Sequence, residues 1–269
     1  MLRRILLTAI IAVGLSHIAN AQELYPYSEP ASNMPSKAIG VRITNEIMTG
    51  PSNYRLSPEI MIGHHKNLMS HAQFYFSNLD KNFQFDGFSL YAKYRFLSID
   101  EVQNHFRMAA FAKASYSDRK INSMDLNLDG DNSGAQLGVV ATQLIHKLAI
   151  SANLSYSAPF NGQDKLFNTA ETPSEYINYS LSTGYLLLPF VYKNYKQPNF
   201  NLYVEAFGKT SVDNGKGYLD LAPAVQFIIN SKTRIDLGYK FQIAGGMTNR
   251  FSKDALMIRA EFNFFNALK

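Results

Sequence analysis

Apolar and polar residues alternate along most of this chain, so that nearly every second side chain is hydrophobic. In the segment ALMIRAEFNFF (255–265), the apolar residues Leu256, Ile258 and Phe262 are interleaved with Arg259 and Glu261. The segments RIDLGYKFQIA (234–244) and FSLYAKYRF (88–96) repeat the pattern. Because a period of two sends successive side chains to opposite faces of a strand, these segments predict β-strands with one apolar and one polar face.

Twelve segments carry this alternation, and amphipathic helical patterns are scarce. They span residues 37–48, 54–63, 67–78, 86–98, 105–118, 134–145, 147–160, 176–189, 199–210, 217–229, 234–245 and 255–266. Most are longer than the ~5–6 residues of an ordinary strand and match the ~9–11 with which a tilted strand crosses a bilayer. Their polar faces also carry charges at mid-strand, as expected where that face lines a lumen and the apolar face meets lipid.

The connections between these segments alternate in character. Those after the first, third and later odd segments are mostly long and polar, such as RKINSMDLNLDGDNS, whereas HHK, DEVQN, HK and NSKT are short and the KNYKQPN region is an exception. Short turns at one end and long loops at the other are typical of outer-membrane barrels. We therefore predict an all-β fold, a single closed up-and-down antiparallel transmembrane β-barrel of about 12 strands, although counts of 10 or 14 also fit the pattern.

The N-terminal region predicts export. Residues 1–21 combine Arg3 and Arg4, a short apolar core and an Ala-Asn-Ala cleavage site, which together indicate a secretory signal peptide. Residues 22–36, the leader, contain Pro26, Pro30 and Pro35 and are unsuited to a central strand. We expect this periplasmic leader to precede the barrel of residues 37–269; the alternative is that it enters the barrel mouth as a plug.

The signal peptide, residues 37–266 and the aromatic C-terminal strand EFNFF resemble the Gram-negative outer-membrane β-barrel class. The chain continues beyond that strand to Lys269, whereas such barrels often end on Phe. The leader QELYPYSEPASNMPSKAIGVRI also looks like the start of predicted Bacteroidota barrels of unassigned activity. The resemblance implies an outer-membrane location, with the lipid bilayer as a partner and the oligomeric state left open.

Charged residues on the polar faces are candidates for the barrel lumen. With mixed signs they suit either the passage of a small polar solute or charge pairing that fills a closed structural or ligand-binding barrel. They are Arg42, Glu46, Glu59, Lys93, Arg95, Arg107, Lys113, Glu205, Asp220, Asp236, Lys240, Arg259 and Glu261.

A candidate metal patch lies in EIMIGHHKNLMSHAQ (59–73). A turn around HHK is expected to pair Met61 with Met69 and Glu59 with His71, all four facing inward near the periplasmic end. Thioether and imidazole ligands suit copper(I). The alternative is an ordinary hairpin whose His64 and His65 are solvated turn residues, because no fixed metal-ligand spacing is matched.

A second candidate site lies in DLNLDGDNS, where Asp125, Asn127, Asp129 and Gly130 match the first half of a calcium loop. Position twelve is Gln136 instead of Glu, so an ordinary polar surface loop is the competing interpretation.

The remaining composition narrows the classes of function. The chain has no Cys and therefore no disulfide or thiolate site. Its net charge of +5 includes two arginines of the signal peptide, so it gives no argument for a nucleic-acid partner. The histidines after the signal peptide all map to the periplasmic half and no G-x-S-x-G motif occurs. We therefore predict a protein that is not an enzyme, with an outer-membrane hydrolase as the remaining alternative.

Overall fold

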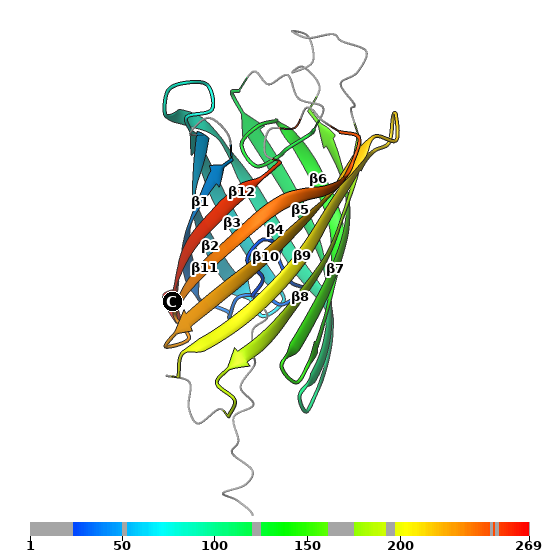
Figure 1. The fold of residues 1–269 in the computed structure, drawn as a ribbon. Coiled ribbons are helices and arrows are strands. Elements are labelled where there is room, and N and C mark those ends of the chain that lie inside the picture. Colours follow the sequence, from blue (N-terminus) through cyan, green and yellow to red (C-terminus); the bar gives the residue numbers. More distant parts are fainter. Residues whose placement is uncertain are drawn as a thin grey trace, which may run out of the picture.

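The structure, a computed structural model, describes residues 24–49, 53–119, 125–160, 175–191, 197–247, 250 and 253–268. The predicted signal peptide lies outside these residues. Twelve strands form one closed antiparallel barrel (Figure 1). They are β1 (Ile39–Met48), β2 (Asn53–His65), β3 (Leu68–Ser77), β4 (Gln84–Glu101), β5 (Asn104–Ser117), β6 (Gly134–Ile145), β7 (Leu148–Pro159), β8 (Tyr176–Leu188), β9 (Asn199–Ser211), β10 (Gly217–Ile229), β11 (Thr233–Gly245) and β12 (Ala255–Phe264).

Each strand pairs with its neighbours in sequence, and β1 closes the barrel by pairing along its whole length with β12. The predicted fold class and the count of twelve are confirmed. Short connections such as residues 66–67 and 146–147 gather at one end, the turn end, together with the longer connection 189–198, and the other longer connections gather at the opposite end, the loop end (Figure 1). Among the described residues, no helix is long and apolar enough to cross a membrane, a finding that does not bear on crossing by strands.

The two faces of the sheet have opposite polarity. Leu181 on β8 is 53% exposed, whereas the adjacent Ser182 is fully buried. Ile60, Leu90 and Ile258 are likewise exposed on the outside of other strands. Exposed leucine and isoleucine around a sheet, with polar residues inside, is the reverse of a water-soluble barrel and suits a surrounding of lipid.

The register of the β2–β3 hairpin differs from the prediction. Met61 is directly opposite His71, Glu59 is opposite Gln73, and Gly63 is opposite Met69. The predicted direct pairs of Met61 with Met69 and of Glu59 with His71 are wrong. A β-bulge between Gly63 and His65 precedes a turn of only two residues, so the turn is centred further along the chain than alternation implied.

The position expected for the leader is also wrong. Its described part, from Leu24 to Ser36, runs inside the barrel (the dark-blue coil in Figure 1) instead of merely preceding β1. Tyr25, Ala31 and Met34 are buried there. Prolines that exclude the leader from a strand do not exclude it from the lumen, because side chains of the wall satisfy its backbone groups.

Candidate functional site in the barrel lumen

The leader is held mainly through its own backbone. The carboxylate of Glu205 on β9 accepts hydrogen bonds from the amides of Tyr27 (2.8 Å) and Ser28 (3.0 Å). On β6, the hydroxyl of Thr142 accepts one from the Ala31 amide at 2.8 Å. These hydrogen bonds satisfy leader amides that have no partner on a neighbouring strand, and so offset the cost of burying them.

Leader carbonyl groups are bound by two more side chains of the wall. The Lys93 ammonium on β4 donates to the carbonyls of Pro30 (2.5 Å) and Ser32 (2.9 Å). Gln226 on β10 donates to the carbonyl of Leu24 at 2.9 Å. We call Lys93, Thr142, Glu205 and Gln226 the leader seat; they stand on four strands, so the leader is fastened across the lumen.

Three side chains of the leader pack into three separate apolar clusters of the barrel interior. Tyr25 packs with Leu144, Ala149, Tyr203 and Ala224, and its ring meets that of Tyr203 edge to face. Ala31, which is fully buried, packs with Ala109, Phe111 and Val140. Met34 lies with Ala38, Met61 and Met69.

Glu29, an acidic residue of the leader, lies beside two cations of the wall. Its carboxylate lies 2.9 Å from Nη1 of Arg42 and 3.8 Å from Nζ of Lys93. Burial raises the pKa of Glu29, but the charges of Arg42, His71 and Lys93 outweigh it and hold the pKa below its usual range. The seated leader therefore carries a carboxylate whose charge is matched by the lumen.

The described segment 125–133 folds back over the loop end of the lumen. Asp131 is buried and bridges Arg55 on β2 and Arg119. Leu126 and Leu128 are buried in a cluster with Tyr176, Met247 and Tyr218. Buried apolar side chains and a buried ion pair fix this segment as part of the barrel interior instead of a solvated loop.

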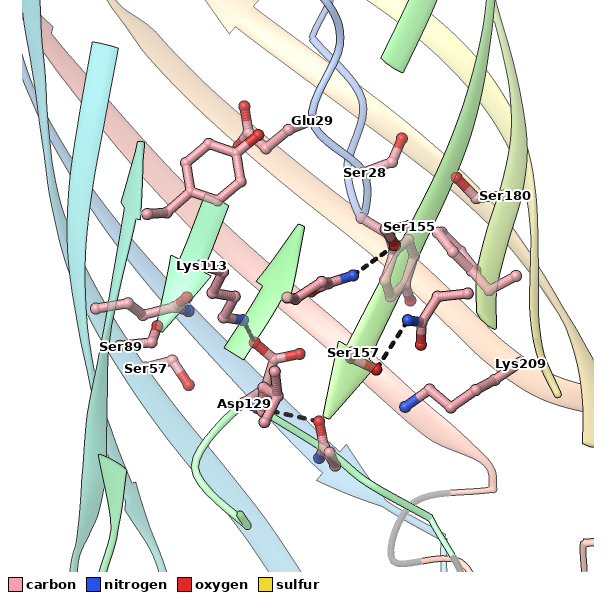
Figure 2. A pocket seen from close by; sticks show the side chains of 18 of the residues that line it. Ser28, Glu29, Ser57, Ser89, Lys113, Asp129, Ser155, Ser157, Ser180 and Lys209 are labelled. Carbon is pink, nitrogen blue, oxygen red and sulfur yellow. Dashed lines mark hydrogen bonds and ion pairs between the residues drawn. The ribbon is translucent and has the colours of Figure 1, made fainter. Parts of the chain in front are cut away.

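A cavity of about 390 Å³ lies between the leader and segment 125–133. Ser28 and Glu29 of the leader border it on one side and Asp129 on the other, with wall hydroxyl, amide and charged groups between them (Figure 2). His71 faces the same space: its Nδ1 lies 2.5 Å from Glu59, its ring packs on Tyr91, and its Nε2 is buried with no hydrogen-bond partner among the described residues. The cavity can hold a small polar molecule.

The structure separates the predicted lumen residues into groups. One group lines the cavity: Arg42, Glu46, Glu59, Lys113, Asp220, Lys240 and Arg259. Lys93 and Glu205 bind the leader backbone, and Arg107 donates to the Ser32 hydroxyl at 2.8 Å. Asp236 and Glu261 contact Arg234 and Arg42 in the wall, and Arg95 donates to the carbonyl of Lys66 in the β2–β3 turn.

Several interior residues were absent from the prediction. Arg55, Lys209 and Arg234 occupy the same strand phases as Glu59, Glu205 and Asp236, so extending the alternation to the strand ends would have found them. Glu29 and Asp131 lie outside strands, where alternation gives no signal.

The residues of the predicted copper patch lie close together, although not in the expected pairs. Met61 and Met69 are buried beside Met34 of the leader, and His71 is bound to Glu59. Within the described part of the chain, no group of three or more His, Cys, Asp or Glu side chains is arranged to hold a metal ion. Copper binding through the thioethers stays a prediction.

Two of the three predicted calcium ligands are paired with lysine side chains. Asp125 accepts from Lys209 at 2.8 Å, and Asp129 accepts from Lys113. Asn127 donates to Asp131, with its amide nitrogen 2.5 Å from the carboxylate. Calcium at these oxygens has to displace lysine ammonium groups, and calcium binding also stays a prediction.

A closed up-and-down barrel with an apolar exterior and a polar, charged interior is the architecture of outer-membrane barrel proteins. Solved outer-membrane porins and channels share this fold. The NanC porin is 11% identical with a TM-score of 0.55, covering 83% of this chain and 98% of that one. The KdgM porin is 10% identical with a TM-score of 0.52, covering 84% and 99%.

The COG4313 outer membrane channel from Pseudomonas putida F1 is 13% identical with a TM-score of 0.55, covering 90% of this chain and 100% of that one. At these identities the likeness is one of fold. No protein-family model and no curated protein sequence matches the chain.

Proposed function

We propose that this chain is an outer-membrane channel, exported through its signal peptide, that passes a small polar solute through the lumen. The observation that carries the proposal is the polar cavity of about 390 Å³ enclosed by a barrel with a lipid-suited exterior. The porin-like fold supports it. Serine, asparagine and glutamine side chains along the wall offer hydrogen bonds to a neutral solute, and charges of both signs there predict little ion selectivity.

Passage requires two segments to move. The leader borders the cavity toward the turn end and segment 125–133 borders it toward the loop end. Displacing the leader breaks hydrogen bonds from its backbone to the leader seat, whereas the ladders between strands remain. The barrel can therefore open its lumen without unfolding.

A closed ligand-binding barrel is the second candidate. The observation that favours it is the fastening of the leader across the lumen, with Ala31 fully buried. A hydrolase has weaker support. His71 and Glu59 resemble a base and its orienting carboxylate, but no described hydroxyl is hydrogen-bonded to Nε2 of His71 to serve as a nucleophile.

Single-channel conductance in planar bilayers tests the proposal with residues 22–269 and the variant Ala31→Arg. Arginine cannot fit where Ala31 is fully buried, so the variant should release the leader and conduct in discrete steps more often than the parent chain. Ser36→Arg adds the same charge at an exposed leader position and is the matched control. Heat-dependent gel mobility confirms that each barrel is folded.

Folded barrels that never conduct, including Ala31→Arg, would contradict the channel and favour the closed binding barrel. Equal conductance of Ala31→Arg and Ser36→Arg, both above the parent chain, would contradict the role of the leader in closing the lumen.

A further inference from the structure

We propose that the leader seat is a binding site for a short peptide without regular secondary structure, which the protein's own leader occupies in this structure. The inference goes beyond passage of a small solute and does not depend on conductance. Three observations carry it: the wall binds main-chain groups of the leader, other wall residues hold most of the binding groups in position, and the wall fits particular leader side chains.

The wall recognises main-chain groups more than side chains. Glu205 accepts two amide hydrogens, Thr142 accepts one, and Lys93 and Gln226 donate to three carbonyl groups. These amides and carbonyls are common to all peptides, apart from the missing N–H of proline. A seat of this kind fits a peptide backbone of the same path, which bends at residues 26–28 and at Ala31, and not one particular sequence.

Three of the four groups of the leader seat, those of Thr142, Glu205 and Gln226, are held in position by other side chains of the wall. Ser182 donates to Glu205 at 2.9 Å, and the hydroxyl of Ser151 lies 2.9 Å from that of Thr142. The amide oxygen of Gln226 accepts from Asn201 at 2.9 Å and from Tyr203 at 3.0 Å, which turns its amide nitrogen toward Leu24. Because these bonds do not involve the leader, its departure leaves an ordered site with unsatisfied polar groups, which a second peptide can fill.

Contacts between the leader's side chains and the wall define the class of peptide. Tyr25 fills an apolar pocket that takes an aromatic ring. Glu29, four residues later, needs an acidic side chain to meet Arg42 and Lys93. Ala31 admits only a small side chain, and Met34 ends the peptide in an apolar contact with Met61 and Met69. The ligand is therefore a short peptide that follows the bent path of the leader, with an aromatic, an acidic and a small residue at this spacing.

The absence of tryptophan from the chain makes a direct binding experiment available. A synthetic peptide of residues 22–36 carrying Tyr27→Trp supplies the only tryptophan signal. It is titrated against the full chain, against the leader variant Glu29→Arg/Ala31→Arg, and against that variant with Glu205→Gln added on the wall. Protease cleavage of the leader, with gel mobility of the barrel, reports on leader release and folding.

We expect a blue shift of tryptophan emission with the leader variant. The parent chain should bind at least about 100-fold more weakly, because its tethered leader competes at an effective concentration in the millimolar range. Glu205→Gln should weaken binding to the leader variant by about tenfold or more, because one amide oxygen replaces a carboxylate that accepts two N–H groups. A peptide carrying Ala31→Arg should not bind.

Two results overturn the proposal. A folded leader variant whose leader is released but which does not bind the peptide shows that the seat works only in cis. A leader that stays protected from protease despite both substitutions shows that the contacts at Glu29 and Ala31 do not select side chains. If the protein binds the peptide but does not conduct, only the proposed channel is contradicted, and the peptide site stands.

Discussion

Replacing Lys93 with methionine tests how strongly the leader is held. Lys93 is fully buried, and its ammonium donates to two leader carbonyls at 2.5 and 2.9 Å. A hydrogen bond from a charged donor contributes ~1.5–3 kcal/mol, and methionine keeps most of the stem volume. We expect the free energy that holds the leader in the lumen to fall by about 3 kcal/mol, which raises the population of the released leader roughly 100-fold.

Hydrogen exchange of residues 24–36, followed by mass spectrometry on the folded barrel, measures this population. Lys113→Met is the matched control, because Lys113 also faces the cavity but binds Asp129 and not the leader. Leader exchange in Lys93→Met that stays within about threefold of the parent chain would refute the argument. Equal acceleration in Lys93→Met and Lys113→Met would assign the effect to a general loosening of the lumen.

Three further predictions follow from the same structure. Gly63→Ala should speed leader exchange, because its Cβ would lie 2.0 Å from the Pro35 carbonyl oxygen. Burial raises the pKa of Glu29, but the neighbouring cations lower it by more, so the net pKa lies below the ordinary value of 4.5. The contribution of Glu29 to leader seating is therefore complete above that value and is lost as the pH falls toward the lowered pKa. The sensitivity of the leader to protease should rise with acid, and should rise less in Glu29→Gln. Leu181→Arg, on the lipid-facing surface, should destabilise the barrel by ~2–4 kcal/mol in urea unfolding from vesicles, whereas Val102→Arg in an exposed turn should change it little.

The strand pattern was predictable because the barrel imposes one simple rule. Each strand has a face toward lipid and a face toward the lumen, so apolar and polar residues alternate wherever the backbone is regular. The strand β6 begins and ends where alternation placed it, at Gly134 and Ile145. For the same reason Lys93, Glu205 and Asp236 could be assigned to the interior from their phase alone.

Which interior residues meet could not be read from the phase. The bulge near Gly63 moved the β2–β3 register, so Met61 faces His71 across the hairpin. A bulge adds one residue to one strand and leaves the alternation on either side intact. The sequence therefore located the residues of the predicted copper patch on the inner face but not their pairing.

By itself, the sequence determined the class of fold, an approximate number of strands and the face on which most strand residues lie, because these depend on local periodicity; the structure fixed the count at twelve. Only the tertiary structure decided that the leader and segment 125–133 enter the lumen. Contacts such as Glu29 with Arg42 or Asp131 with Arg55 join an irregular segment to a strand, so no sequence periodicity relates the two residues. The stability of such a contact depends on its burial and on the position of the partner charge. Those contacts determine whether the lumen is a passage, a closed interior or a peptide site.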